Sequence, residues 1–177
     1  VYSVLSKPQG VRKAFEVLDE LRPHIAWWES GDEPARLLKS GEVTMSSAYN
    51  GRMFHAQVVR DSPIQIVWDG QLYDFNFLAI PRGAPHPEAA MSFIRFATRP
   101  ERLAHQARLI PYAPVRRSAR PMVTTHLVTG VSMHRHMPTA DVNFEGALRN
   151  DYEWWARNQE RIDRRFDEWL ESGTAGP

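Results

Sequence analysis

A segment in the middle of the chain alternates aromatic and polar side chains at what looks like the end of a strand. The segment YDFNF, residues 73–77, runs directly into the apolar stretch LAI, residues 78–80. A buried strand has no use for the carboxylate of Asp74 or the amide of Asn76, because burying an unpaired polar group costs free energy. A small ligand, in contrast, needs apolar walls and a few fixed hydrogen-bond partners. The pattern therefore predicts a ligand-binding site that includes Tyr73, Asp74 and Asn76.

A second group of residues allows a different chemistry. His134 and His136 stand two apart in MHRHMP, so on a strand they would share one face and could bind zinc. With Asp74 as a general base, this pair would make a metal-dependent hydrolase. No third metal ligand stands at motif spacing, and the sequence contains no phosphate-binding loop, dinucleotide fingerprint or Gly-x-Ser-x-Gly motif. The histidines are therefore interpreted as part of an exposed loop. We expect a binding protein that is not an enzyme, and the hydrolase remains the alternative.

Six tryptophans are present, and four of them form the adjacent pairs Trp27-Trp28 and Trp154-Trp155. Neighbouring residues cannot face the same core on either a helix or a strand. One member of each pair should therefore face solvent, a cleft or another segment. For Trp154, Trp155 and Trp169 we expect that the side chains dock a C-terminal helix. A structural domain with its tryptophans at an oligomer interface is a further alternative.

Composition narrows the classes of function. The chain has 177 residues, of which 42% are hydrophobic, and this suffices for one domain or two small lobes. The formal charge is +1, so no strong field of one sign points to nucleic acid. Cysteine is absent, which excludes thiolate catalysis, disulfides and cysteine metal sites. No apolar run approaches the roughly 20 residues that span a bilayer. No cofactor is expected.

Strands that alternate with helices predict an α/β protein. Apolar residues at helical spacing, with prolines near several starts, indicate the helices, and β-branched or alternating runs indicate the strands. The expected helices are 11–21, 35–40, 50–62, 86–98, 101–109 and 151–171. The expected strands are 24–29, 42–49, 64–68 and 72–81. The segment 111–130 should be irregular or carry only short helical turns.

Several runs, taken in order, resemble the bacterial ABC-transporter solute-binding proteins of the spermidine/putrescine type. They are WWESGDEPARLLKSGEVTMSSAYNGR, YDFNFLAIPRGAPHPEAAMSFIRFATRPE and LIPYAPV, within residues 9–118, and the tail DYEWWARNQERIDRRFDEWL resembles that family's closing helix. The resemblance implies the α/β fold of a periplasmic binding protein of type II. In that fold two lobes are joined by crossing strands, and the ligand lies in the cleft between them.

If the resemblance holds, the chain is the C-terminal part of such a two-lobe architecture. Residues 1–75 would belong to the second lobe, 76–120 would supply the crossover strand and helices of the first lobe, and 121–177 would return to the second lobe with the C-terminal helix. The chain opens on Val1 without an initiator Met, so we expect an upstream part to be missing. Lobes that lack their other half would expose apolar surface, and we then expect a dimer.

The resemblance also assigns binding residues. The aromatic residue before Asn-Gly, which packs on the ligand's methylene chain, corresponds to Tyr49, where Trp is common in the family. The Tyr of the Pro-Tyr turn corresponds to Tyr112, and the Ser of the loop after the first strand corresponds to Ser30. These residues, with the aromatic Tyr73, would supply apolar, cation–π and hydrogen-bonding contacts.

One position departs from the family pattern. Polyamine binders carry an acidic residue where this chain has Asn76, which can accept a hydrogen bond but has no charge to offset the desolvation of an ammonium. Asp74 lies two residues earlier and would face the same side of a strand, so it could substitute. The implied function is capture of a polyamine or related small organic amine in the periplasm and delivery to an ABC permease in the inner membrane.

Overall fold

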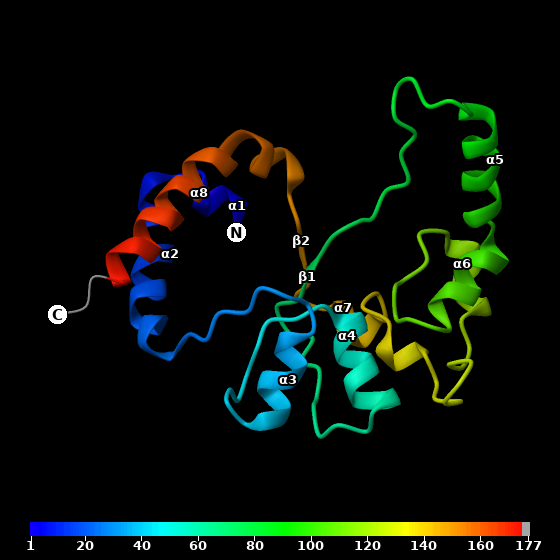
Figure 1. Ribbon diagram of the computed structural model, residues 1–177, viewed down its shortest axis with the longest axis horizontal. Helices are drawn as coiled ribbons and strands as arrows, with labels where there is room; N and C mark the ends of the chain where they lie inside the picture. The colour runs from blue at the N-terminus through cyan, green and yellow to red at the C-terminus, as the bar shows by residue number, and fades with distance from the viewer. Residues whose placement is uncertain (175–177) are drawn as a thin grey trace. The chain divides into compact units, whose positions relative to one another are not determined.

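The computed structural model describes residues 1–174, which fall into two compact units (Figure 1). The first unit joins Val1–Trp27 to the chain from Asn150 onward, and the second comprises Trp28–Arg149. Each unit contains a hydrophobic cluster of its own. Among residues 1–174, no helix is both long enough and apolar enough to cross a lipid bilayer.

Unit 1 is built from helices. α1 (Tyr2–Leu5) precedes α2 (Pro8–Leu21), and the 3₁₀ turn η1 (Arg22–His24) follows α2. α8 (Tyr152–Thr174) is the long C-terminal helix. A proline opens α2, where its missing N–H removes no helical hydrogen bond and its fixed φ suits the first turn. The positions of α2 and α8 agree with the helices predicted at 11–21 and 151–171.

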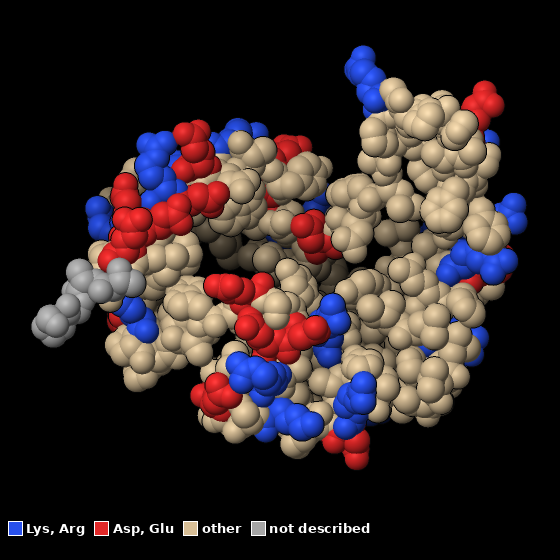
Figure 2. Space-filling model, in the orientation of Figure 1, with Lys and Arg blue, Asp and Glu red and all other residues tan. Residues whose placement is uncertain are grey.

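The core of unit 1 lies between α2 and α8. Val11 and Phe15 are four residues apart, so they share one face of α2, and with Trp169 they form a buried cluster. Burial of an apolar side chain of this size stabilises the fold by about 1.5–3 kcal/mol. Charged side chains of both signs gather over α8 in the view of Figure 2. The partly buried residues packed against the cluster are Leu18, Ile25, Ile162, Phe166 and Leu170.

Two tryptophans fasten α8 to the N-terminal helices. The indole N–H of Trp169 donates to Asp19 Oδ1 at 2.7 Å, and the Arg22 guanidinium lies 3.8 Å from the Trp169 ring centroid. Arg22 also donates to the Trp169 carbonyl at 2.8 Å. The indole N–H of Trp154 donates to Ser6 Oγ at 2.9 Å. The predicted docking of the C-terminal helix through these side chains is confirmed.

The adjacent tryptophans differ in environment, as predicted. Trp154 is buried whereas Trp155 is half-buried, and their ring planes are nearly perpendicular, at 88°. Trp27 is 57% exposed although its ring centroid lies 5.8 Å from that of Phe166. The neighbouring Trp28 belongs to unit 2 and is half-buried.

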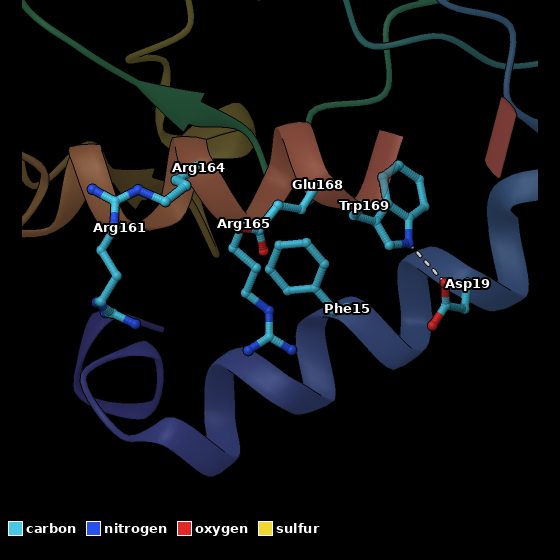
Figure 3. Close-up of a pocket in the computed structure, with 7 residues that line it drawn as sticks. All are labelled: Phe15, Asp19, Arg161, Arg164, Arg165, Glu168 and Trp169. Carbon is cyan, nitrogen blue, oxygen red and sulfur yellow. Dashed lines mark hydrogen bonds between the residues drawn. The ribbon is translucent and has the colours of Figure 1, made fainter. Parts of the chain in front are cut away.

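An open hollow of about 520 Å³ lies between α2 and α8 (Figure 3). Charged groups on its walls interact with neighbours in the same two helices. The guanidinium of Arg165 lies 4.5 Å from the Phe15 ring centroid, and Arg164 pairs with Glu160 at 2.9 Å. We therefore interpret the hollow as a groove between packed helices. Its lining residues are Phe15, Asp19, Arg161, Arg164, Arg165, Glu168 and Trp169.

Unit 2 contains short elements linked by long loops. Its helical elements are α3 (Glu33–Ser40), α4 (Asn50–Phe54), the π-helical turn η2 (His55–Val59), α5 (Pro87–Ala97), α6 (Pro100–Ala107), η3 (Arg117–Met122), η4 (His134–His136) and α7 (Asp141–Phe144). Proline opens α3, α5 and α6, where its fixed φ suits the first turn of a helix. η3 falls in the segment 111–130, where only short helical turns were expected.

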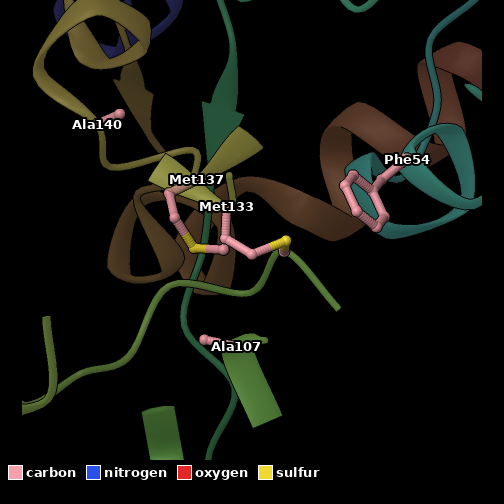
Figure 4. Packing of buried hydrophobic residues seen from close by; sticks show 5 residues of the cluster. All are labelled: Phe54, Ala107, Met133, Met137 and Ala140. Atoms are coloured by element: carbon pink, nitrogen blue, oxygen red, sulfur yellow. The ribbon is translucent and has the colours of Figure 1, made fainter. Parts of the chain in front are cut away.

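One small sheet and one methionine-rich cluster organise unit 2. β1 (Leu72–Tyr73) pairs in parallel with β2 (Leu148–Arg149), with Leu72 opposite Leu148 and Tyr73 opposite Arg149. The buried cluster joins α4, α6 and the segment around η4 (Figure 4). Its members are Phe54, Ala107, Met133, Met137 and Ala140. The cluster thus connects residues that lie up to 86 positions apart, from 54 to 140.

The strand predictions are largely wrong in this structure. Within residues 1–174, the segments 24–29, 42–49 and 64–68 contain no assigned strand, and of 72–81 only Leu72–Tyr73 is in a ladder. Their β-branched and aromatic residues favour extended backbone. A strand also needs a partner for its N–H and C=O groups, however, and within residues 1–174 no sheet ladder includes the segments 24–29, 42–49 and 64–68.

Candidate functional site

Tyr49 stands at the start of α4 and forms an aromatic wall with Trp28. It is the N-cap residue of the helix, with extended backbone, and its side chain is 61% exposed. Its ring centroid lies 6.0 Å from that of Trp28, with the planes nearly perpendicular at 75°. The indole N–H of Trp28 donates to Ser47 Oγ at 3.4 Å, which fixes the orientation of the indole. Two rings held in this way offer an apolar surface to a small molecule.

The loop that carries Ser30 is tied down by one carboxylate. Glu33, at the start of α3, accepts the backbone N–H groups of Glu29 at 2.6 Å and Ser30 at 2.9 Å. Both hydrogen bonds favour the ionised form of Glu33 and therefore lower the pKa of its carboxyl, and the bond from the Ser30 amide has the larger effect. A Cβ placed on Gly31 would lie 3.3 Å from the Tyr49 ring. The absence of a side chain there lets Tyr49 lie directly against this loop.

Tyr112 also lies against the first turn of α4. The side-chain amide of Asn50 donates to the Pro111 carbonyl at 2.7 Å, which joins α4 to the Ile-Pro-Tyr turn. A Cβ on Gly51 would lie 3.0 Å from Tyr112 Cε1. The structure therefore gathers Ser30, Tyr49 and Tyr112 around the first turn of α4, although they are 82 positions apart at the extremes.

An ion pair beside Tyr49, between Arg52 and Asp32, was not predicted from the sequence. Arg52 in α4 pairs with Asp32 at 2.9 Å, and both side chains are exposed. Arg52 Nε would lie 3.9 Å from a Cβ on Gly31, so the pair borders the Ser30 loop. The Arg that follows Asn-Gly was visible in the sequence, but nothing there linked it to the loop before α3. The pair could meet both a carboxylate and an ammonium of a ligand.

The residues of the aromatic–polar segment have a different environment. Tyr73 is half-buried in β1, with its ring centroid 5.0 Å from that of Phe144 and 6.1 Å from that of Phe75. Asp74 is exposed and accepts the Phe75 N–H at 2.7 Å. Asn76 is exposed. Their convergence with Tyr49 and Tyr112 on one ligand stays a prediction.

The histidine pair does not lie on a strand. His134 and His136 belong to the 3₁₀ turn η4, and the expected loop is wrong in part because His136 is half-buried. The ring of His136 lies 5.0 Å from that of Phe54. Burial, and then repulsion from His126, lower the pKa of His136. Among residues 1–174, no three or more His, Asp or Glu side chains gather as metal ligands, so the hydrolase gains no support.

Two hollows of the described chain are lined by other residues. One is the groove of unit 1, and the other, of about 220 Å³, is lined by Trp68, Asp69, Val142, Asn143 and Glu145. Neither contains a residue predicted to bind ligand. The residues gathered at α4, namely Ser30, Tyr49 and Tyr112, form an exposed surface.

Comparison with known proteins identifies the family. The family model described as "Bacterial extracellular solute-binding protein" matches residues 2–139. The chain is 38% identical over 169 residues to the gamma-aminobutyric acid-binding protein of Pseudomonas aeruginosa, covering 96% of this chain and 46% of that protein. It is 30% identical over 146 residues to the spermidine/putrescine-binding periplasmic protein of Salmonella typhimurium, covering 81% of this chain and 40% of that protein.

Comparison with solved structures also points to solute-binding proteins. An ABC transporter substrate-binding protein from Bradyrhizobium japonicum superposes with a TM-score of 0.78 at 28% identity, over 90% of this chain and 49% of that one. The predicted fold class is confirmed, because the chain has the α/β fold of a periplasmic binding protein. The chain spans about half the length of the relatives that it matches.

The relatives and the superposed structure are solute-binding proteins, so the chain belongs to a class of binding proteins and not of enzymes. The family is described as extracellular and the Salmonella typhimurium relative as periplasmic, and we place the chain in the periplasm accordingly. The match of the family model over residues 2–139 and the 38% identity across nearly the whole chain show that it is a member of the bacterial extracellular solute-binding protein family.

Proposed function

We propose that the chain forms part of the substrate-binding component of an ABC importer, which captures a small organic amine and delivers it to a membrane permease. The observation that carries this proposal is the gathering of Ser30, Tyr49 and Tyr112 at the first turn of α4. Tyrosine faces attract an organic cation and cover its methylene groups, while a hydroxyl supplies a hydrogen bond. No bond in the ligand is made or broken in this function.

The ligand is proposed to carry a primary ammonium. The names of the two relatives include gamma-aminobutyric acid and the polyamines spermidine and putrescine, which share that group. Asp74 would pair with the ammonium, and Asn76 and Ser30 would add hydrogen bonds. Tyr73 would extend the aromatic wall. A polyamine is the ligand that the resemblance implies.

A ligand with a carboxylate as well as an ammonium is the second candidate. Arg52 beside Tyr49 offers a guanidinium that suits a carboxylate, and Asp32 offers the opposite charge. Arg52 therefore makes an amino acid such as gamma-aminobutyric acid the second candidate ligand beside a polyamine.

The lobes are proposed to follow the division suggested by the resemblance. Residues 1–75 and 121–177 would belong to the second lobe, and 76–120 would belong to the first. Ligand would favour the closed arrangement by binding it more tightly than the open one. A dimer of this chain is also proposed, because several apolar side chains of unit 2 are exposed.

Titration calorimetry with putrescine, spermidine and gamma-aminobutyric acid tests the proposed function. We expect heat of binding from at least one amine. Tyr49→Ala should weaken it about tenfold, since a cation–π contact contributes about 1–2 kcal/mol. Tyr152→Ala, which truncates an exposed tyrosine of the other unit, is the matched control and should leave the affinity unchanged. Absence of heat with every amine would remove the proposal.

A further inference from the structure

His126 is a buried polar residue that the proposed site does not yet include. It lies at the base of a short hairpin closed by the bridge between Thr125 and Ser132, and its side chain is only 4% exposed. The backbone N–H of Thr129 donates to His126 Nδ1 at 3.1 Å. Because Nδ1 accepts this hydrogen, the proton of the neutral ring is on Nε2. That N–H then donates to the Leu109 carbonyl at 3.2 Å.

The hairpin is fastened to the end of α6 by further hydrogen bonds. The N–H of Leu127 donates to the Arg108 carbonyl at 2.9 Å, and Arg108 Nε donates to the Thr125 carbonyl at 2.9 Å. The His126–Leu109 bond is the part of this connection that lies nearest to the turn carrying Tyr112. The chain from Leu109 to Tyr112 is thereby held at its first residue by an imidazole.

The same imidazole also packs on α4. Its ring centroid lies 5.3 Å from that of Phe54, with the planes at 65°, and Phe54 is almost fully buried at the end of the helix. α4 begins after Tyr49, and the Asn50 side chain donates to the Pro111 carbonyl. His126 therefore contacts both segments on which the tyrosines of the proposed site stand.

We propose that His126 is a positioning residue of the ligand site: it holds the turn 109–112 against α4 and so fixes Tyr112 relative to Tyr49. The inference deepens the proposed function and rests on it for the ligand. The imidazole suits this task because it accepts a hydrogen bond at one nitrogen and donates one at the other. A buried ring without these groups could still pack on Phe54 but would release Leu109.

The molecule supplies a matched control in His136. Its ring also packs on Phe54, at 5.0 Å and 74°, from the turn η4. In the part of the chain that the structure describes, the His136 side chain makes no hydrogen bond to the turn 109–112. Replacing either histidine by Phe keeps an aromatic ring against Phe54. Only His126→Phe removes the bond to Leu109.

The first experiment needs no ligand and uses the whole chain. Nitrogen-15 chemical shifts should show His126 as the Nε2–H tautomer. His126→Phe should raise the hydrogen-exchange rates of the Ile110, Tyr112 and Leu127 amides about tenfold or more, which is roughly the effect of losing one buried hydrogen bond. His136→Phe should leave these amides within about twofold of the native rate. A proton on Nδ1, or equal exchange in both variants, would overturn the inference.

The second experiment asks whether His126 acts through Tyr112. Calorimetry with putrescine and gamma-aminobutyric acid should show that His126→Phe weakens binding about tenfold, as expected for losing one or two hydrogen bonds. In a Tyr112→Ala background the same substitution should cost nothing further, because the residue being positioned is gone. His126→Gln, which retains a donor and an acceptor, should recover part of the affinity.

The two arms separate the inference from the proposed function. Losses that add fully in the double variant would mean a merely structural role and would overturn the inference. If the native chain binds none of putrescine, spermidine and gamma-aminobutyric acid, the proposed function fails, and the exchange and tautomer measurements still decide whether His126 holds the turn.

Discussion

At the scale of single residues, hydrogen bonds to carboxylates organise parts of both units. Glu33 accepts the Ser30 and Glu29 amides, and Asp19 accepts the Trp169 indole N–H, so the pKa of each carboxyl is lowered. For a carboxyl with a lowered pKa, the stabilisation is present above the unfolded pKa, 4.5 for Glu and 3.8 for Asp, and is lost as the pH falls through the folded value. The stabilisation from these two carboxylates is therefore present at neutral pH and is lost only in strongly acidic solution.

His136 titrates in a higher window. Burial lowers its folded pKa below the ordinary 6.5, so the unfolded chain binds the proton more readily. Stability is then full above about pH 6.5 and falls as the pH drops toward the lowered folded pKa. We expect the guanidinium chloride concentration at the unfolding midpoint to be lower at about pH 5.5 than at about pH 7.5. In His136→Phe the difference between the two midpoints should be smaller. Equal midpoints in the native protein at the two pH values would contradict this.

At the scale of elements, the contact between α4 and the Ile-Pro-Tyr turn depends on a glycine. A Cβ on Gly51 would lie 2.9 Å from Ile110 Cδ1 and 3.0 Å from Tyr112 Cε1, closer than carbon atoms normally approach. Both contacts are with side-chain atoms, which can move in part. The helix and the turn can therefore approach this closely only while position 51 lacks a side chain.

Gly51→Ala should destabilise the protein by about 1–2 kcal/mol in chemical unfolding, since overpacking costs about 1–3 kcal/mol and helix propensity returns up to about 1 kcal/mol. Amine affinity should fall as well, because Tyr112 is displaced. The control is Ser92→Ala on the exposed surface of α5, which changes helix propensity without a new contact. An unchanged midpoint and affinity in Gly51→Ala would show that the turn adapts freely.

At the scale of the whole molecule, unit 2 exposes an apolar surface formed by 75–80 and α5. Phe77 is 77% exposed and Phe93 is 62% exposed, and no residue of α5 is buried although seven of its eleven residues are apolar. Exposed contiguous apolar surface tends to associate. This surface is the physical basis for the predicted dimer.

Sedimentation velocity over a range of concentrations tests self-association. We expect the native chain to associate, and the double variant Phe77→Asp/Phe93→Asp to shift toward the monomer because it places charge on the apolar surface. Met45→Asp changes an equally exposed apolar residue outside this surface and should have little effect. A native chain that stays monomeric at every concentration would contradict the prediction.

The helices could be predicted because their signals are local. Prolines at the starts of α2, α3, α5 and α6 and the spacing of apolar residues such as Val11 and Phe15 act within one or two turns. The strand predictions for 42–49 and 64–68 failed because an extended segment forms a strand only when it hydrogen-bonds to a neighbouring segment. The sequence of the segment itself does not show whether such a partner exists.

The sequence by itself determined the helices, the family and a set of aromatic and polar residues suited to a small amine. Only the tertiary structure decided that Ser30, Tyr49 and Tyr112 meet at the start of α4 and that Arg52 and His126 stand beside or behind them. The physical reason is that these contacts join distant positions, as in the bond from Asn50 to Pro111, 61 residues apart. Such contacts depend on how the whole chain packs, and no local pattern of side chains specifies them.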